Sequence, residues 1–190
     1  FALHDVDLGA AHEPADGLIP SYELREPFLA RSVRDKHRCD GMGACMAVRR
    51  AAWEALGGFD PGLGAGTPLR SAEENDFALR ALLAGYWVYE TPAVRVRHHG
   101  LRPWVDHDRL VAGYLFGTGA MFAKHVRLGH GSVLPLLGRV FRRWVFERPL
   151  VGYTAAPKRL LRLSAFCRGW IEGLKTPLDR STGLFRPDPR

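Results

Sequence analysis

The stretch that constrains this chain most strongly is residues 71–85, SAEENDFALRALLAG. Its apolar side chains recur at the spacing of a helix face: Phe77, Leu79, Leu82 and Leu83. Glu73 and Glu74 stand in the first turn, where the helix dipole favours negative charge. Ser71 is the expected N-cap, and the glycine after Ala84 is a typical stop. The spacing therefore predicts a helix over residues 72–84 that begins with acidic side chains.

The start of this helix holds the densest chemistry of the chain, Glu73-Glu74-Asn75-Asp76. Clustered like charges raise the pKa of at least one carboxyl group, which is one way to make a general base that works near neutral pH. On a helix Glu73 and Asp76 share a face, whereas Glu74 projects about 100° away. The other interpretation is a helix N-terminus that merely carries acidic residues.

The residues before this helix alternate between small apolar segments and glycine-rich turns. Cys39–Val48 predicts a loop that feeds a buried strand, ended by Arg49-Arg50. Residues 50–56 contain helix formers, and Gly57-Gly58 supplies the expected stop. The glycine-rich stretch Gly62–Gly66 is too flexible for regular structure and is typical of an active-site loop.

After the helix, Tyr86–Tyr89 and Ala93–His98 predict extended segments, the second alternating Val with Arg. His98 and His99 end that segment, where successive side chains point to opposite faces, so only one imidazole can enter a given pocket. A neutral imidazole is a common ligand of divalent cations. Paired histidines are more often structural.

The second half of the chain predicts helices, first from Asp106 onward and then over Val133–Phe146 and Lys158–Leu174. The last two carry an apolar stripe beside a cationic one. Such helices either lie on an anionic membrane or pack as ordinary core. If they lie on a membrane, the inserted side chains are Phe141, Trp144, Trp170 and Leu174. The tail from Lys175 onward predicts irregular structure.

Composition fits a globular protein of 190 residues with 46% hydrophobic positions, either one domain or part of a larger one. The start at Phe1 leads us to expect an excised fragment. The formal charge is +7, and beyond Gly100 the sequence has 16 Lys and Arg against 6 Asp and Glu. That excess indicates an acidic partner. Aromatic residues do not interleave with the cations, which argues against nucleic acid as that partner. Cysteine spacing indicates reduced thiols in a cytoplasmic setting, and no apolar run is long enough to span a membrane.

In their order, these motifs resemble the C-terminal half of an inverting family-2 glycosyltransferase of GT-A fold, over roughly residues 38–128. The motifs are DGMGACMAVRR (40–50), LGGFD (56–60), EENDFALR (73–80) and HHG (98–100). The resemblance implies an α/β fold class: residues 1–105 form the C-terminal part of a Rossmann-like nucleotide-diphospho-sugar transferase domain. Residues 106–190 are then a basic helical extension.

The resemblance also implies roles for single residues. Glu74 stands where the family usually has an Asp base, a departure of one methylene, with Glu73 and Asp76 as supporting carboxylates. His98 matches the family's metal-site histidine, which implies a divalent cation, Mn or Mg. The implied substrate-binding residues are Asp40, Gly41, Met42, Gly43 and Arg80.

The function implied is transfer of a sugar from a nucleotide-sugar donor to a saccharide or lipid-linked acceptor, in cell-surface polysaccharide or glycolipid synthesis. The enzyme would be cytoplasmic, and peripheral on the inner face of the cell membrane if its helices touch lipid. The family's nucleotide-binding half has no counterpart in the sequence, so we expect the chain alone to be inactive. The alternative is a non-enzymatic basic module that binds an anionic membrane or nucleic acid.

Overall fold

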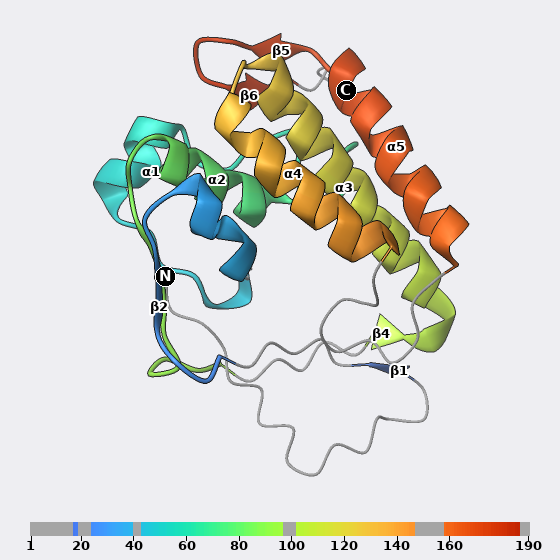
Figure 1. Ribbon diagram of the computed structural model, residues 1–190, viewed down its shortest axis with the longest axis horizontal. Helices are drawn as coiled ribbons and strands as arrows, with labels where there is room; N and C mark the ends of the chain where they lie inside the picture. Colours follow the sequence, from blue (N-terminus) through green and yellow to red (C-terminus); the bar gives the residue numbers. More distant parts are fainter. Residues whose placement is uncertain (1–16, 19–23, 40–42, 97–101, 147–157, 187–190) are drawn as a thin grey trace.

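The structure is a computed structural model that describes residues 17–18, 24–39, 43–96, 102–146 and 158–186, and helices dominate it (Figure 1). The longer helices are α1 (Arg50–Leu56), α2 (Glu73–Leu83), α3 (His107–Arg127), α4 (Leu134–Phe141) and α5 (Arg159–Lys175). Short helical segments are η1 (Val33–Arg38), η2 (Gly43–Cys45), η3 (Trp104–Asp106), η4 (Gly131–Val133) and η5 (Arg142–Phe146). The strands are β1 (Gly17–Leu18), β2 (Phe28–Ala30), β3 (Val88–Glu90), β4 (Arg102–Pro103), β5 (Leu178–Asp179) and β6 (Leu184–Phe185).

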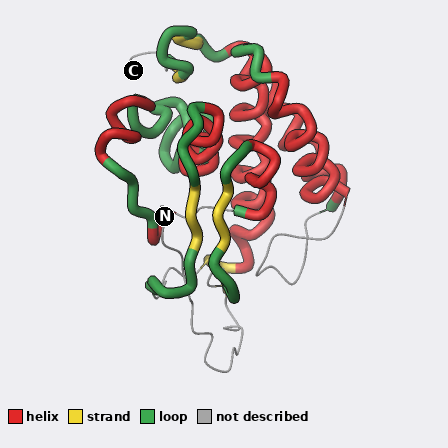
Figure 2. The backbone as a smooth tube through the Cα atoms, turned by 60° about the vertical axis from the view of Figure 1, so that its left-hand side comes forward, coloured by secondary structure: helices red, strands yellow, loops and turns green. Residues whose placement is uncertain are grey.

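The strands pair only as antiparallel ribbons of two, β1 with β4, β2 with β3 and β5 with β6. Figure 2 shows β2 and β3 side by side in front of the helices. A parallel sheet needs several buried strands joined by crossovers, and the described segments do not supply them. The predicted α/β class with a Rossmann-like sheet is therefore not seen in the described part of the chain, whereas its helices are.

Helices α1 and α2 confirm the two helices predicted in the first half. Helix α1 ends at Gly57, whose φ of +72° is the left-handed conformation that closes many helices. At the start of α2 the expectation for Ser71 was wrong. Its hydroxyl donates to the Gly113 carbonyl at 3.1 Å, and Ala72 occupies the N-cap position. Ser71 therefore ties α2 to α3 instead of capping α2.

The extended segments predicted on either side of α2 are confirmed only in part. The expected strand up to Val48 is not seen in the described residues of that stretch: residues 43–45 form a helical turn, and residues 46–49 are irregular and not buried. Strand β3 confirms the extended segment that begins at Tyr86. Of the second predicted segment, residues 93–94 turn, residues 95–96 are irregular, and residues 97–98 lie outside the described residues. Neither missing segment has a neighbouring strand to pair with among the described residues, and an isolated strand is not stable in water.

In the second half of the chain α3 packs along α5, and α4 contacts α5 through the rings of Phe141 and Phe166 (Figure 1). Small residues bring α3 and α5 into close contact. A Cβ atom on Gly169 of α5 would collide with the Phe116 carbonyl of α3, and one on Gly173 would lie 2.6 Å from the Ala120 carbonyl oxygen. The backbones therefore approach more closely than any larger residue at these glycines would allow.

Replacing Gly169 by Ala should force α3 and α5 apart and lower the free energy of unfolding by about 1–3 kcal/mol. Chemical denaturation measures this loss. Gly138→Ala in α4 is the matched control, because nothing lies within 4 Å of its added methyl group. We expect the control to be neutral or stabilising, since Ala favours a helix over Gly. Equal stability of the two variants would contradict the close packing.

The tail after α5, which the structure describes as far as residue 186, is not irregular as its composition led us to expect. Strands β5 and β6 make a hairpin whose Phe185 side chain is 1% exposed. The Phe185 amide donates to Asp60 Oδ2 at 3.1 Å. The hairpin therefore covers part of the main hydrophobic core, which also contains residues from α2, α3, α4 and α5.

Most of the apolar side chains on α4, η5 and α5 pack against other parts of the protein. The ring of Phe141 lies edge-on to Phe166 at 5.1 Å, and Phe166 stacks with Trp170. Trp144 packs against a second small cluster from α3 and α5, whereas Leu174 is 45% exposed. Packing therefore occupies three of the four side chains that a membrane surface would need. Within the described segments no helix is both long and apolar enough to cross a bilayer.

Candidate active site

Two residues with strained backbone conformations precede the first turn of α2. Arg70 and Ala72, just before the acidic residues, have φ values of +74° and +80°. Residues with a Cβ rarely adopt this conformation, and each instance costs on the order of 1–3 kcal/mol. Such strain persists only where the surrounding structure imposes it, so the position of Glu73 and Glu74 is fixed by the fold.

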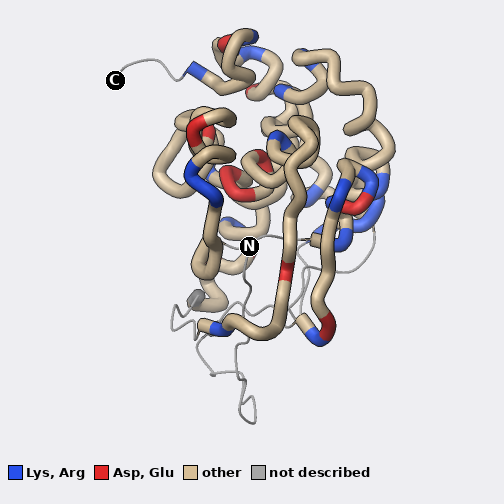
Figure 3. Tube along the Cα trace, turned by 90° about the vertical axis from the view of Figure 1, so that its left-hand side faces the viewer, with Lys and Arg blue, Asp and Glu red and all other residues tan. Residues whose placement is uncertain are grey.

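These carboxylates open onto a cleft of about 600 Å³ (Figure 3 shows the charges of this region). Its lining residues are Gly43, Met46, Val48, Arg50, Trp53, Glu54, Phe59, Glu73 and Glu74. Three of them are acidic and one is basic, so the cleft is negative. Two aromatic rings form part of its wall, with Trp53 39% and Phe59 38% exposed. The cleft thus combines acceptors of hydrogen bonds with flat apolar surface.

The surroundings of Glu74 change the proton affinity of its carboxylate. Burial, and then the negative charge of Glu73, raise its pKa above the ordinary value. Its Oε1 accepts a hydrogen bond from the Gly43 amide at 3.1 Å, which opposes the shift without cancelling it. A carboxylate with a raised pKa is a stronger base and is still partly within reach of solvent. This arrangement can accept a proton from a bound hydroxyl group.

Two glycines make room for the acidic pair. A Cβ on Gly43 would collide with Glu74 Oε1, and a Cβ on Gly64 would lie 3.0 Å from Glu73 Cδ. Gly64 also has a φ of +108°, a conformation that favours glycine. The glycine-rich loop predicted as part of an active site therefore does contact the acidic side chains.

Asp76 lies apart from this cleft, fully buried in a network of charged side chains. Its Oδ1 is 2.7 Å from Lys124 Nζ and 3.0 Å from His125 Nε2, and its Oδ2 accepts from Arg80 Nε at 2.7 Å. Burial works against the charged form of Asp76, but Lys124, His125 and Arg80 outweigh it and hold the pKa of this carboxyl well below its usual range. Asp76 is thus placed to anchor α2 and does not face a substrate.

Arg80 belongs to the same network. Besides Asp76, its guanidinium donates to the carbonyls of Leu56 at 2.6 Å and Gly58 at 2.7 Å. It is 6% exposed. The resemblance implies that Arg80 binds substrate, but its contacts favour a structural role: Arg80 joins the end of α1 to α2.

The structure thus brings together Glu73, Glu74 and Gly43 and separates Asp76 and Arg80 from them. The other predicted site residues, Asp40, Gly41, Met42 and His98, lie outside the described residues. Among the described residues, no three His, Cys, Asp or Glu side chains are grouped so that they could hold a metal ion. The predicted divalent cation therefore has no donor set in this part of the chain.

Sequence reasoning missed the aromatic wall and most of the buried network. Trp53 and Phe59 flank the Gly57-Gly58 turn, and their rings meet edge-on at 5.1 Å. Lys124 is fully buried in α3 and forms a 2.5 Å ion pair with Asp60. The sequence does place Lys124 and His125 inside an otherwise apolar stretch of α3. Because buried charges are nearly always paired, these two residues could have indicated a buried ionic network.

Comparison of the chain with protein-family models, with curated proteins and with solved structures gave no match.

Proposed function

We propose that this chain is the acceptor-side portion of an inverting glycosyltransferase of the GT-A type. The observation that carries the proposal is the Glu74 carboxylate, with its raised pKa, at the wall of an acidic cleft that also presents aromatic rings. The order of motifs that resembles family-2 glycosyltransferases supports it independently, since Glu74 is the residue that the resemblance aligns with the base.

In the proposed reaction Glu74 accepts the proton of an acceptor hydroxyl group. The hydroxyl oxygen forms a bond to the anomeric carbon of the donor sugar as the bond from that carbon to the nucleotide diphosphate breaks, and the configuration inverts. Glu73 raises the proton affinity of Glu74, and the Gly43 amide fixes Oε1 of the base. The proton ends on Glu74 and the negative charge on the leaving diphosphate.

The cleft suits a neutral saccharide better than a diphosphate. Pyranose rings have apolar faces that pack on aromatic side chains, and Trp53 and Phe59 offer such surfaces. Their hydroxyl groups can donate to the carboxylates of Glu54, Glu73 and Glu74, whereas a diphosphate would be repelled by them. We therefore assign this cleft to the acceptor and place the nucleotide elsewhere.

No step is assigned to a metal ion, because the described residues do not supply its ligands. A divalent cation at His98, a nucleotide-sugar donor, a lipid-linked form of the acceptor and a location on the inner face of the membrane stay predictions from the resemblance.

Methionine methyl groups provide a direct binding test, since Met46 lines the acceptor cleft and Met121 lines a different pocket. In protein labelled with ¹³C-methyl methionine, we expect neutral oligosaccharides to shift the Met46 resonance and to leave Met121 unchanged. Trp53→Ala should weaken this binding, whereas Trp87→Ala, at a 60% exposed tryptophan that does not line the cleft, should not. Tighter binding of polyanionic than of neutral saccharides would contradict the assignment.

A further inference from the structure

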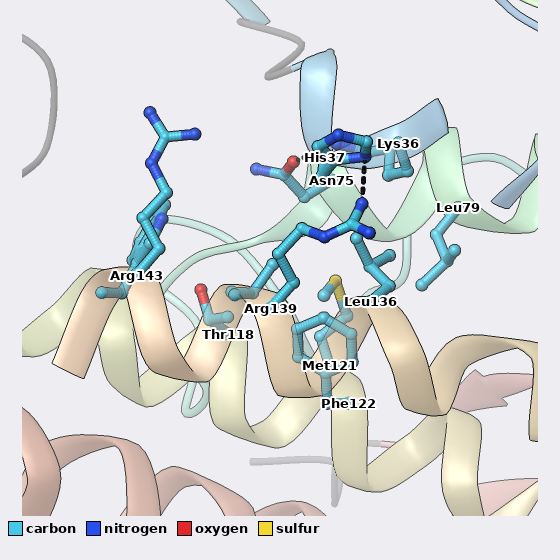
Figure 4. A pocket seen from close by; sticks show the side chains of 12 residues that line it. Lys36, His37, Asn75, Leu79, Thr118, Met121, Phe122, Leu136, Arg139 and Arg143 are labelled. Carbon is cyan, nitrogen blue, oxygen red and sulfur yellow. Dashed lines mark hydrogen bonds between the residues drawn. The ribbon is translucent and has the colours of Figure 1, made fainter. Parts of the chain in front are cut away.

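A second pocket lies between η1, α3 and α4, and the α2 residues Asn75 and Leu79 also line it (Figure 4). It uses none of the residues of the acceptor cleft. Its interior is apolar and consists of Leu79, Met121, Phe122 and Leu136, all of them buried. The interior therefore favours a hydrocarbon group over water.

The size of this pocket restricts what can enter it. Its volume is about 70 Å³. An engineered apolar cavity that binds benzene measures about 150 Å³. The pocket is therefore too small for an aromatic or sugar ring and fits a short alkyl segment.

Basic side chains also line the pocket. Arg139 and Arg143 stand one helical turn apart on α4 and η5, and Lys36 and His37 approach from η1. Figure 4 shows Arg139 reaching towards His37 while Arg143 extends away from the helix. None of the residues that line the pocket is acidic. A ligand that complements this surface carries negative charge next to its alkyl group.

The described contacts leave Arg139 available to such a ligand. The Lys36 ammonium group already has protein partners, because its Nζ donates to the Cys39 carbonyl oxygen at 2.6 Å and to Asn75 Oδ1 at 2.8 Å. Arg139 lies 2.6 Å from His37 Nδ1, but the same nitrogen lies 2.8 Å from the Arg34 carbonyl oxygen. The carbonyl oxygen of Arg34 can only accept a hydrogen bond. When Nδ1 of His37 carries a proton, it donates to Arg34 and cannot accept the hydrogen bond from Arg139. Among the described residues, Arg139 therefore has one hydrogen bond, which depends on the tautomer of His37, and no carboxylate partner.

We propose that this pocket binds a monoalkyl phosphate. Arg139 and Arg143 hold the phosphate, and about three to five carbons of the alkyl chain lie on Met121, Phe122 and Leu136. Two arginines one turn apart can each donate two hydrogen bonds to a phosphate, which presents enough oxygen atoms for both. The proposal does not depend on the glycosyltransferase function, because it uses different residues and a different face of α2.

The test follows the methionine methyl resonances during titration with n-butyl phosphate, inorganic phosphate and n-dodecyl phosphate below its micelle concentration. The chain has three methionines, of which Met121 reports on this pocket and Met46 on the acceptor cleft. We expect a saturable shift of Met121 alone with butyl phosphate, and binding of inorganic phosphate at least about tenfold weaker, because it buries no methylene groups. Tighter binding of the dodecyl compound would indicate a lipid as the source, and equal binding a soluble metabolite.

Variants separate the two halves of the proposed site. Arg139→Gln and Arg143→Gln should each weaken butyl phosphate by about tenfold or more, through loss of charge-assisted hydrogen bonds. Arg168→Gln, an exposed residue of α5 outside the pocket, is the control with the same loss of charge. Val140→Phe should fill the pocket and abolish the Met121 shift while the circular dichroism spectrum stays unchanged. The proposal is overturned if inorganic and butyl phosphate bind equally, if Met121 does not shift, or if Arg168→Gln weakens binding as much as the pocket variants.

Discussion

Asp76→Asn is expected to lower the free energy of unfolding by about 3–5 kcal/mol, the usual cost of removing one partner from a buried ionic network. The variant keeps the shape of the side chain but removes its charge. Of the partners that the structure describes, Lys124 then keeps the carboxylate of Asp60, and Arg80 keeps the carbonyls of Leu56 and Gly58. Denaturant unfolding near pH 7 measures the loss, and Glu54→Gln, at an exposed residue, should change stability by less than about 0.5 kcal/mol.

The pH dependence of this effect has a definite sign. Because the folded-state pKa of Asp76 lies below its ordinary value of 3.8, its charge stabilises the protein above that pH and stops doing so as the pH falls towards the folded-state value. The difference between wild type and Asp76→Asn should therefore be greatest above about pH 5 and shrink in acid. A difference below about 1 kcal/mol at pH 7 would show that the network does not anchor α2.

Glu74→Gln should have the opposite effect on stability and a large effect on catalysis. Loss of a general base typically lowers the rate by about 10²–10⁴-fold. The assay requires a protein that joins this chain to a nucleotide-binding region, with UDP-, GDP- and dTDP-sugars as donors. Donor binding should be unchanged, and Glu172→Gln, at an exposed residue of α5, should transfer sugar normally. Retained transfer by Glu74→Gln would rule out this residue as the base.

The same variant should unfold at a higher temperature than wild type near neutral pH. Burial and Glu73 disfavour the charged carboxylate of Glu74, and Gln removes that charge while its Oε1 still accepts from the Gly43 amide. Since the folded-state pKa is raised, wild type loses stability as the pH rises from 4.5 through that value. The advantage of Gln should therefore appear above this range and vanish in acid. A loss of activity together with a gain in stability cannot come from damage to the fold.

Local sequence signals predicted the helices well. Helices α1 and α2 have apolar spacing and glycine stops that identify them without tertiary information, and α3 to α5 follow the same periodicity. Whether a predicted extended segment forms a strand depends on a neighbouring strand to pair with, and the local sequence does not identify that neighbour. Cys39–Val48 has the composition of a buried strand, but without a neighbour to pair with its described part forms a turn and irregular structure.

For the candidate site, the sequence pointed to the acidic cluster at residues 73–76 but not to the different surroundings of its carboxylates. Glu73, Glu74 and Asp76 are nearly adjacent along the chain, so their charges look equivalent. Only the fold, through Lys124 and Asp60, buries one and leaves the others at the cleft. The wall formed by Trp53 and Phe59 depends on a turn that brings α1 and the following loop together. The residue types alone do not predict this contact.

The most direct test of the central claim, that burial and Glu73 tune Glu74 into a base, is a titration of its side-chain carboxyl by ¹³C NMR, with Glu74→Gln used to assign the resonance. We expect a pKa above the ordinary glutamate value of 4.5 in wild type and a lower one in Glu73→Gln. A wild-type pKa at or below 4.5, or one unmoved by Glu73→Gln, would contradict the claim.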